Sequence, residues 1–392
     1  MDDMRPLGAT GEPMSTPEFE LLLACARTVP DPGRIQQLVR QKLDWSAFWD
    51  LATHHNVRPL ALRSMQMTCW IEVPEQYQRE WQEALRILNG RSLFLMGELI
   101  GIVQSLEHDG IQVCVLKGLL YGQILYGDVM LRETSDFDLL IREEDLRRAT
   151  KVFEDLGYRP HAGVKIEQLT ELLKYVGEYP FLGDGKLVDI DLHWRLSNKP
   201  LALAPDLSDF PLSPQRFTLA NSLMQSIAIE ELPLYLATQG GNDSWNDLRR
   251  ITDLAEYLRR FPHTDWRPVI ATARRHHAEL IVFVGLQLAV NLLGATLPGD
   301  VAAELEHIPA TQELASAVER RMREQQSPGS LQRHVFQIQA KSGIGEKGRL
   351  LWSILTDRMA ADAWWIHLPQ FCWWLYRLLR PIRMVLKLGS TE

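Results

Sequence analysis

Two aspartates stand two residues apart at the start of an apolar run, RETSDFDLLI (residues 132–141). In a strand, successive side chains point to opposite faces, so Asp136 and Asp138 share one face while Phe137 lies on the other. Two carboxylates this close repel each other unless a cation or a proton lies between them. The alternative is a polar turn that Asp136 caps, since Thr-Ser-Asp is good turn chemistry. The pair therefore indicates either a metal site or a capped turn.

A second acidic strand is predicted in VDIDLHWRL (residues 188–196), after an Asp-Gly dipeptide that is typical of a β-hairpin turn. Asp189, Asp191 and His193 occupy alternate positions and therefore share one face. Acids that converge from two strands are what two-metal phosphoryl transfer requires, because two Mg²⁺ ions then hold the attacking and leaving oxygens. This second set favours the metal site over the capped turn.

Residues suited to phosphate lie upstream of both acidic strands. Lys117 and Gly118 follow a short β-branched run, IQVCVL (residues 111–116), and precede a helical pattern. A backbone that turns from a strand into a helix presents N–H groups to an anion, and the ammonium adds charge. Arg132, four residues before Asp136, can reach the same anion. The pattern predicts a triphosphate held between cationic groups and metal ligands.

The elements that must position these residues divide the chain into four segments. Residues 1–16 are rich in Gly, Pro and acids and are predicted to be a flexible N-terminus. Apolar residues spaced by three and four predict a helical region over 17–106. Short strands alternate with helices over 107–198, and 199–392 forms a second helical region, helical again from about Ser222.

Composition excludes several classes of protein. The chain has 392 residues, a net charge of -8 and a sequence pI near 5.8, which argues against a general nucleic-acid binder. The four cysteines form no Cys-x-x-Cys pair, so no zinc site or disulfide framework is indicated. No uninterrupted apolar run is long enough for a transmembrane helix. A cytoplasmic protein is expected.

The order LKG, LYGDVMLRETSDFDLLI and VDIDLHWRL resembles the uncharacterised nucleotidyltransferase family of the DNA polymerase-beta-like superfamily, in which Lys-Gly replaces the more usual Gly-Ser. The resemblance covers residues 106–196 most closely. It implies site residues at six positions: Asp136, Asp138 and Asp191 for metal and catalysis, and Lys117, Gly118 and Arg132 for the nucleotide.

The resemblance implies an α+β fold, with a small mixed β-sheet nucleotidyltransferase core flanked by N- and C-terminal helical regions. It implies transfer of a nucleoside monophosphate from an NTP, with ATP favoured, to an unidentified acceptor, with Mg²⁺ (two ions) as cofactor and release of pyrophosphate. A small molecule, peptide or protein is favoured over nucleic acid as the acceptor. The alternative is a non-catalytic nucleotide- or partner-binding protein that retains the fold.

Three assignments stay open at this stage. Asp189 shares the face of Asp191 and is the rival for the third carboxylate, although the resemblance favours Asp191. His193 is predicted to bind nucleotide, but it could instead donate to a carboxylate or simply pack beside Trp194. Asp253 lies among apolar residues at helical spacing and is interpreted as a partner of Arg249 or Arg250.

Two features of the C-terminal half bear on binding partners. Family members often carry a His-rich helix in this half, whereas this chain has Gln239, Asn242 and Asp243 in the matching stretch. Near the C-terminus, four tryptophans (Trp364, Trp365, Trp373 and Trp374) are interleaved with Arg377, Arg380, Arg383 and Lys387. The second pattern predicts either core packing or contact with a partner chain or a membrane surface.

Overall fold

The N-terminal helical region forms as the apolar spacing predicts. The computed structural model describes residues 15–161, 177–183, 185–196 and 214–356, with 375 and 379. Three of the first helices begin after an N-cap residue, Thr16, Asp31 or Asp44, whose side chain accepts a hydrogen bond from a backbone N–H in the first turn of the helix. The helices are α1 (Pro17–Cys25), α2 (Pro32–Val39), α3 (Trp45–His54), α4 (Arg58–Thr68) and, after η1 (Trp70–Glu72), α5 (Glu75–His108).

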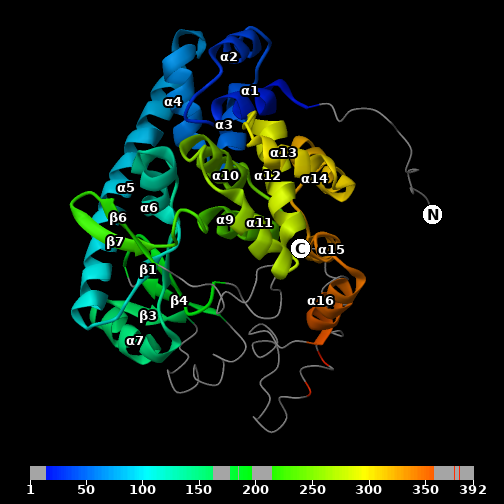
Figure 1. The fold of residues 1–392 in the computed structure, drawn as a ribbon. Helices are drawn as coiled ribbons and strands as arrows, with labels where there is room; N and C mark the ends of the chain where they lie inside the picture. Colours follow the sequence, from blue (N-terminus) through cyan, green and yellow to red (C-terminus); the bar gives the residue numbers. More distant parts are fainter. Residues whose placement is uncertain are drawn as a thin grey trace.

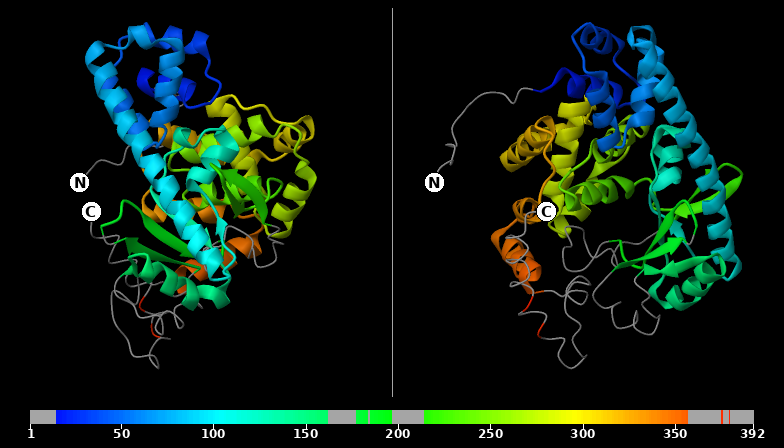
Figure 2. Two further views of the ribbon diagram at one scale, coloured as in Figure 1. Left: turned by 90° about the vertical axis from the view of Figure 1, so that its left-hand side faces the viewer. Right: turned by 180° about the vertical axis from the view of Figure 1, so that it is seen from behind.

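Helix α5 connects the two ends of the molecule. It has 34 residues, which corresponds to about 51 Å at 1.5 Å per residue. Its N-terminal half packs with α3 and α4, where Trp81 is fully buried among other aromatic rings. Its C-terminal half runs beside the sheet and α7 (Figures 1 and 2). The helix therefore fixes the sheet relative to the N-terminal region.

The sheet of the described residues has seven strands in the order β3-β4-β5-β2-β1-β7-β6. It is mixed, because β2 pairs with β5 and β1 with β7 in parallel, while the other neighbours are antiparallel. The strands are β1 (Cys114–Val115), β2 (Asp136–Leu140), β3 (Tyr158–Pro160), β4 (Glu178–Gly183), β5 (Asp189–His193), β6 (Gln215–Leu219) and β7 (Ser222–Ser226). The α+β fold class with helical flanks is confirmed.

One face of the sheet is apolar and lies against α7 (Leu146–Asp155). Phe137 and Ile190 are buried on this face, and Phe153 of α7 meets Phe181 of β4 edge to face with ring centroids 5.0 Å apart. The apolar residues of α7 are strongly segregated to one side of the helix, which is the side that such a helix buries. Because this face carries the core, the opposite face is left for polar side chains.

The connection between β1 and β2 is mostly helical. It contains α6 (Gly118–Tyr121), the π-helical turn η2 (Gly122–Tyr126) and the 3₁₀ turn η3 (Val129–Leu131). After β2, the 3₁₀ turn η4 (Glu143–Asp145) leads into α7. These short elements confirm the helical pattern predicted after Gly118.

The prediction of helix from about Ser222 is wrong, because β7 occupies that position and the next helix begins at Leu232. Met224 is buried while Leu223 is exposed, which is the alternation of a strand. Ala220 turns between β6 and β7 with φ of 51°. The hairpin joins the sheet because β7 pairs with β1.

The C-terminal helices pack around α12, which is almost wholly apolar. Trp245, fully buried, occupies a space where Gly240 and Gly285 lack side chains. No helix of the described residues is long and apolar enough to cross a membrane. The helices are α9 (Leu232–Asn242), α10 (Leu248–Arg260), α11 (Trp266–Arg275), α12 (Glu279–Leu293), α13 (Gly299–Glu306), α14 (Pro309–Arg323), α15 (Ser330–Gln339) and α16 (Ile344–Thr356).

Candidate active site

Four carboxylates share the polar face of the sheet where β2 and β5 run side by side. The parallel register sets Asp136 opposite Asp189 and Asp138 opposite Asp191. Laterally paired residues point to the same face, so both acidic pairs face away from the apolar core. The structure therefore brings together the acids of the two strands that the sequence analysis singled out.

Asp138 is the buried member of this group, with 5% of its surface exposed. Its Oδ1 accepts a hydrogen bond from Lys117 Nζ at 2.8 Å and lies 3.0 Å from His193 Nε2. Burial by itself raises the pKa of Asp138, but the charge of Lys117 and the hydrogen bond from His193 outweigh burial and hold the pKa well below its usual value. Asp138 is therefore ionised, with Lys117 as its counter-ion.

Both ring nitrogens of His193 contact carboxylates. Nε2 faces Asp138, and Nδ1 lies 3.2 Å from Glu178 Oε2. Burial lowers the pKa of His193, but the hydrogen bond and charge of Asp138 and the charge of Glu178 raise it above its usual value. His193 thus links two acids, an arrangement that orients the buried carboxylate.

Sequence reasoning missed Glu178, which lies opposite His193 in the β4–β5 ladder. A two-residue turn at the Asp-Gly dipeptide would pair β4 with β5 in a register shifted by two residues from the one observed. The connection is longer, since β4 ends at Gly183 and β5 begins at Asp189. Asp184 lies outside the described residues. Only the length of the connection between β4 and β5, which the dipeptide does not give, would have identified Glu178.

Of the two rival acids on β5, Asp191 lies closer to the buried centre. Burial, with the nearby charges of Asp136 and Asp138, raises the pKa of Asp191 to about 6. Asp189 is exposed, and its Oδ1 accepts a hydrogen bond from Gly183 N at 3.0 Å. The crowding of like charges that indicates a cation site therefore involves Asp191 rather than Asp189.

The Lys117–Gly118 junction has the backbone geometry of a tight turn into a helix. Gly118 opens α6 with φ of 64°, a conformation that side chains disfavour. A Cβ at this position would also lie 3.2 Å from Thr134 Cγ2. Thr134 itself is buried, and its Oγ1 has no hydrogen-bond partner. Glycine is required here because the segment before β2 packs directly on this backbone.

The Arg132 side chain is buried, deeper in the protein than a direct contact with a bound phosphate would require. Its Nε and Nη2 donate to Asp253 at 3.0 and 2.9 Å, and its Nη1 lies 3.5 Å from Gly118 O. Asp253 counteracts the effect of burial and raises the pKa of Arg132. The assignment of Arg249 or Arg250 as the partner of Asp253 is therefore wrong. The partner comes from the segment before β2, which periodicity along α10 cannot reveal.

The carboxylates fit Mg²⁺ in chemical type and in their common face. Asp136 lies at the start of β2, where its Oδ1 accepts from Ser135 Oγ at 2.8 Å. Within the described residues, no three acidic, His or Cys side chains already stand close enough to hold a metal ion. Asp138 is instead directed to Lys117 and His193. Both contacts are made to Oδ1, so a metal ion would share this carboxylate with Lys117 and His193 or compete with them for that oxygen.

The features of the C-terminal half lie on α9 and directly after it, or outside the described residues. Gln239 and Asn242 belong to α9, and Asp243, which follows it, forms an ion pair with Arg250. The Trp- and Arg-rich stretch over residues 364–387 lies outside the residues that the structure describes. Its assignment to core packing or to a binding surface stays a prediction.

A family model described as "Uncharacterised nucleotidyltransferase" matches residues 41–294, more than half of the chain. The chain belongs to this nucleotidyltransferase family. The matched range contains the acidic strands, the Lys117–Gly118 junction and helices from both flanks. No curated protein matches this nucleotidyltransferase family member. Family membership suggests a role in nucleotidyl transfer.

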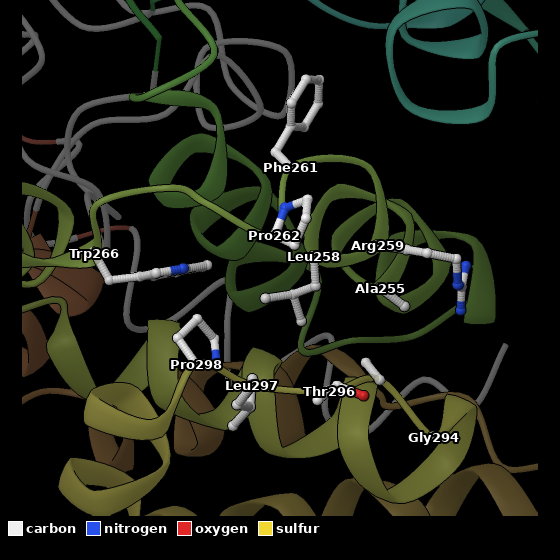
Figure 3. Close-up of a pocket in the computed structure, with 11 residues that line it drawn as sticks. Ala255, Leu258, Arg259, Phe261, Pro262, Trp266, Gly294, Thr296, Leu297 and Pro298 are labelled. Carbon is white, nitrogen blue, oxygen red and sulfur yellow. The ribbon is translucent and has the colours of Figure 1, made fainter.

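The protein has a cavity of about 340 Å³ between the end of α10 and the loop after α12, away from the carboxylates. Leu258, Pro262, Trp266 and Pro298 are among the residues that line it, and the Arg259 side chain extends away from its centre (Figure 3). Arg259 is already paired with Glu256. The cavity is thus largely apolar and contains none of the predicted site residues.

Proposed function

We propose that this protein transfers a nucleoside monophosphate from an NTP, with ATP favoured, to an acceptor hydroxyl or amine in a Mg²⁺-dependent reaction that releases pyrophosphate. The observation that carries the proposal is the parallel pairing of Asp138 with Asp191 on a polar face, with Lys117 Nζ 2.8 Å from Asp138. Family membership gives this arrangement its reaction class.

In this proposal the three acids have different roles. Asp136 and Asp138 would hold two Mg²⁺ ions, and Asp191 would complete the site on the side of the attacking group. When bound, Mg²⁺ supplies charge stabilisation for the triphosphate and acidifies the attacking group. Asp191 is paired with Asp138 on the same face, so its carboxylate would lie on the side from which the acceptor's proton leaves.

Lys117 is proposed to exchange partners during binding. Its ammonium now neutralises Asp138, and a triphosphate would offer it oxygens of higher charge. Gly118 opens α6, so the backbone N–H groups at the start of this helical stretch would be the partners of a phosphate oxygen.

For His193 and Arg132 we propose indirect roles in nucleotide binding. Both His193 nitrogens already face carboxylates, so this ring would orient Asp138 rather than contact the nucleotide. Arg132 is held by Asp253, so a direct phosphate contact would break a buried ion pair. We propose that it supports the Lys117–Gly118 junction instead.

The wider assignments belong to the same proposal. They include membership of the polymerase-beta-like superfamily, which the resemblance implies, and two Mg²⁺ ions as cofactors, which the acid pattern favours. A small molecule, peptide or protein is proposed as the acceptor in preference to nucleic acid, because the chain is acidic. A cytoplasmic location is proposed. The Trp- and Arg-rich C-terminal stretch is proposed to meet a partner chain or a membrane surface.

A non-catalytic nucleotide-binding protein is the second candidate. The observation that favours it is the neutralisation of Asp138 by Lys117 and His193, which lets the acids persist without metal. Nucleotide binding without release of pyrophosphate from the NTP in the presence of any acceptor of the screen would support this alternative.

The test combines calorimetry of Mg²⁺·ATP binding with a screen of acceptors for pyrophosphate release. Asp136→Asn with Asp138→Asn should abolish Mg²⁺-dependent binding, because the charges that hold metal are removed. Asp189→Asn is the matched control, since it removes an exposed acid from the same face. If the double variant binds Mg²⁺·ATP as the native protein does, the proposed site is wrong.

A further inference from the structure

The segment directly before β2 has no regular structure, yet helices of both flanks hold it in place. It comprises residues 132–134, between η3 and β2. Each of its three residues contacts a side chain from α4, α5 or α10. Because only Ser135 separates this segment from Asp136, the position of the segment sets where the acidic strand begins.

Asp253 of α10 makes the central contact. Only 4% of its surface is exposed, and its carboxylate accepts bonds from Arg132 and from Tyr126 Oη at 2.7 Å. Tyr126 ends the helical stretch that starts at Gly118. The same Arg132 guanidinium reaches Gly118 O. One carboxylate therefore ties the Lys117–Gly118 junction to the acidic strand.

Two further contacts hold the segment from other sides. The carboxylate of Glu133 accepts from Arg58 Nε at 3.1 Å, and its carbonyl accepts from Arg249 Nη1 at 3.2 Å. Thr134 O accepts from Arg91 Nη1 at 2.6 Å. Arg91 Nη2 also donates to Leu187 O at 3.2 Å, just before β5. Helix α5 thereby bridges the approaches to both acidic strands.

We propose that Asp253 is a positioning residue that sets the separation between Lys117 and the carboxylates of β2 through Arg132. Its effect on metal and nucleotide binding rests on the proposed function. The ion pair is buried and makes several hydrogen bonds, so it tolerates little displacement. All residues of this arrangement lie within the matched family range 41–294. The helices that carry them are thus part of the site's architecture.

The experiment compares Asp253→Asn with Glu256→Gln in the full chain. Glu256 is the matched control: it lies on α10, is 2% exposed and is ion-paired, but its partners are Thr28 and Arg259 rather than the segment before β2. Hydrogen exchange followed by mass spectrometry reports the mobility of peptides over 129–141. Mn²⁺ titration followed by electron paramagnetic resonance reports metal affinity.

We expect Asp253→Asn to accelerate exchange over 129–141 and to weaken Mn²⁺ binding by about tenfold or more, as substitutions behind metal ligands do. Glu256→Gln should lower the melting temperature without either change. Equal behaviour of the two variants would overturn the proposal. If the native protein binds no Mn²⁺, the proposed metal site fails, and hydrogen exchange still decides the positioning role.

Arg91→Gln covers the case in which Asp253→Asn does not fold. This substitution removes the bonds to Thr134 O and Leu187 O from a partly exposed side chain. It should accelerate exchange at the start of β2 and at the start of β5 together. Unchanged exchange at both places would show that flanking helices do not position the strands, which also overturns the proposal.

Discussion

At the scale of single residues, the candidate site is a balance of charge around Asp138. Lys117 and His193 stabilise its ionised form, while Asp191, close by, has its pKa raised by burial and by its acidic neighbours. Of the two aspartates, Asp191 is the one whose surroundings disfavour the charged form. A cation would relieve this repulsion, which is the physical basis of the proposed metal site.

Asp191→Asn should therefore stabilise the metal-free protein near pH 8. The folded-state pKa of Asp191 is raised from 3.8 to about 6, so its ionisation costs stability as the pH rises through that interval. We expect a gain of roughly 1 to 3 kcal/mol at pH 8 that vanishes near pH 4. Urea unfolding at both pH values, in the presence of a chelator, measures the difference.

Asp189→Asn provides the comparison for this prediction. Asp189 is exposed and bonds to Gly183 N, so its removal should give no gain at pH 8. An Asp191→Asn variant that is less stable than the native protein at pH 8 would show that the carboxylate is stabilising, and the repulsion argument would fail.

At the scale of elements, α9 and α12 approach closely because glycines face Trp245. Gly240 of α9 and Gly285 of α12 both lie against its ring. The Gln239-to-Asp243 stretch therefore has a packing role in this chain. Gly97 of α5 differs from these two glycines, because no atom lies within 4 Å of where its Cβ would stand.

Alanine at these two helical positions should have opposite effects on stability. Gly240→Ala forces a methyl group into the Trp245 ring and should cost about 1 to 3 kcal/mol. Gly97→Ala should add about 0.5 to 1 kcal/mol, because it lowers the entropy of the unfolded chain without a clash. Thermal unfolding of both variants tests the pair. Equal changes would contradict the packing described for Trp245.

At the scale of the whole molecule, the sheet is completed from outside the 107–198 segment. Strand β1 has only two residues and pairs with β7, which lies beyond that segment. Helices α4, α5 and α10 hold the residues before β2. The proposed core therefore depends on both flanks for its edges and for its site.

A fragment of residues 107–198 should consequently fail to fold cooperatively by itself. It would lack β7 as a partner for β1 and would expose the apolar surfaces that α5 covers. Near-ultraviolet circular dichroism and urea titration test this, with residues 15–356 as the control. A cooperative transition of the short fragment would show that the segment is an independent domain.

The sequence by itself determined the elements whose signal is local. Alternation placed Asp136 with Asp138 and Asp189 with Asp191 on strand faces, and apolar spacing predicted α1 to α5. These patterns depend only on residues a few positions apart, which is why they could be read along the chain. The family resemblance added the order of the motifs.

Tertiary structure alone decided which distant residues meet. Arg132 reaches Asp253, although 121 residues separate them, because α10 packs beside the turn η2. Glu178 meets His193 because the hairpin connection is longer than its turn signal indicates. Register and helix docking depend on the summed burial of many side chains, so no local spacing encodes them. Long-range packing thus set the surroundings of acids whose positions on their strands were already readable from the sequence.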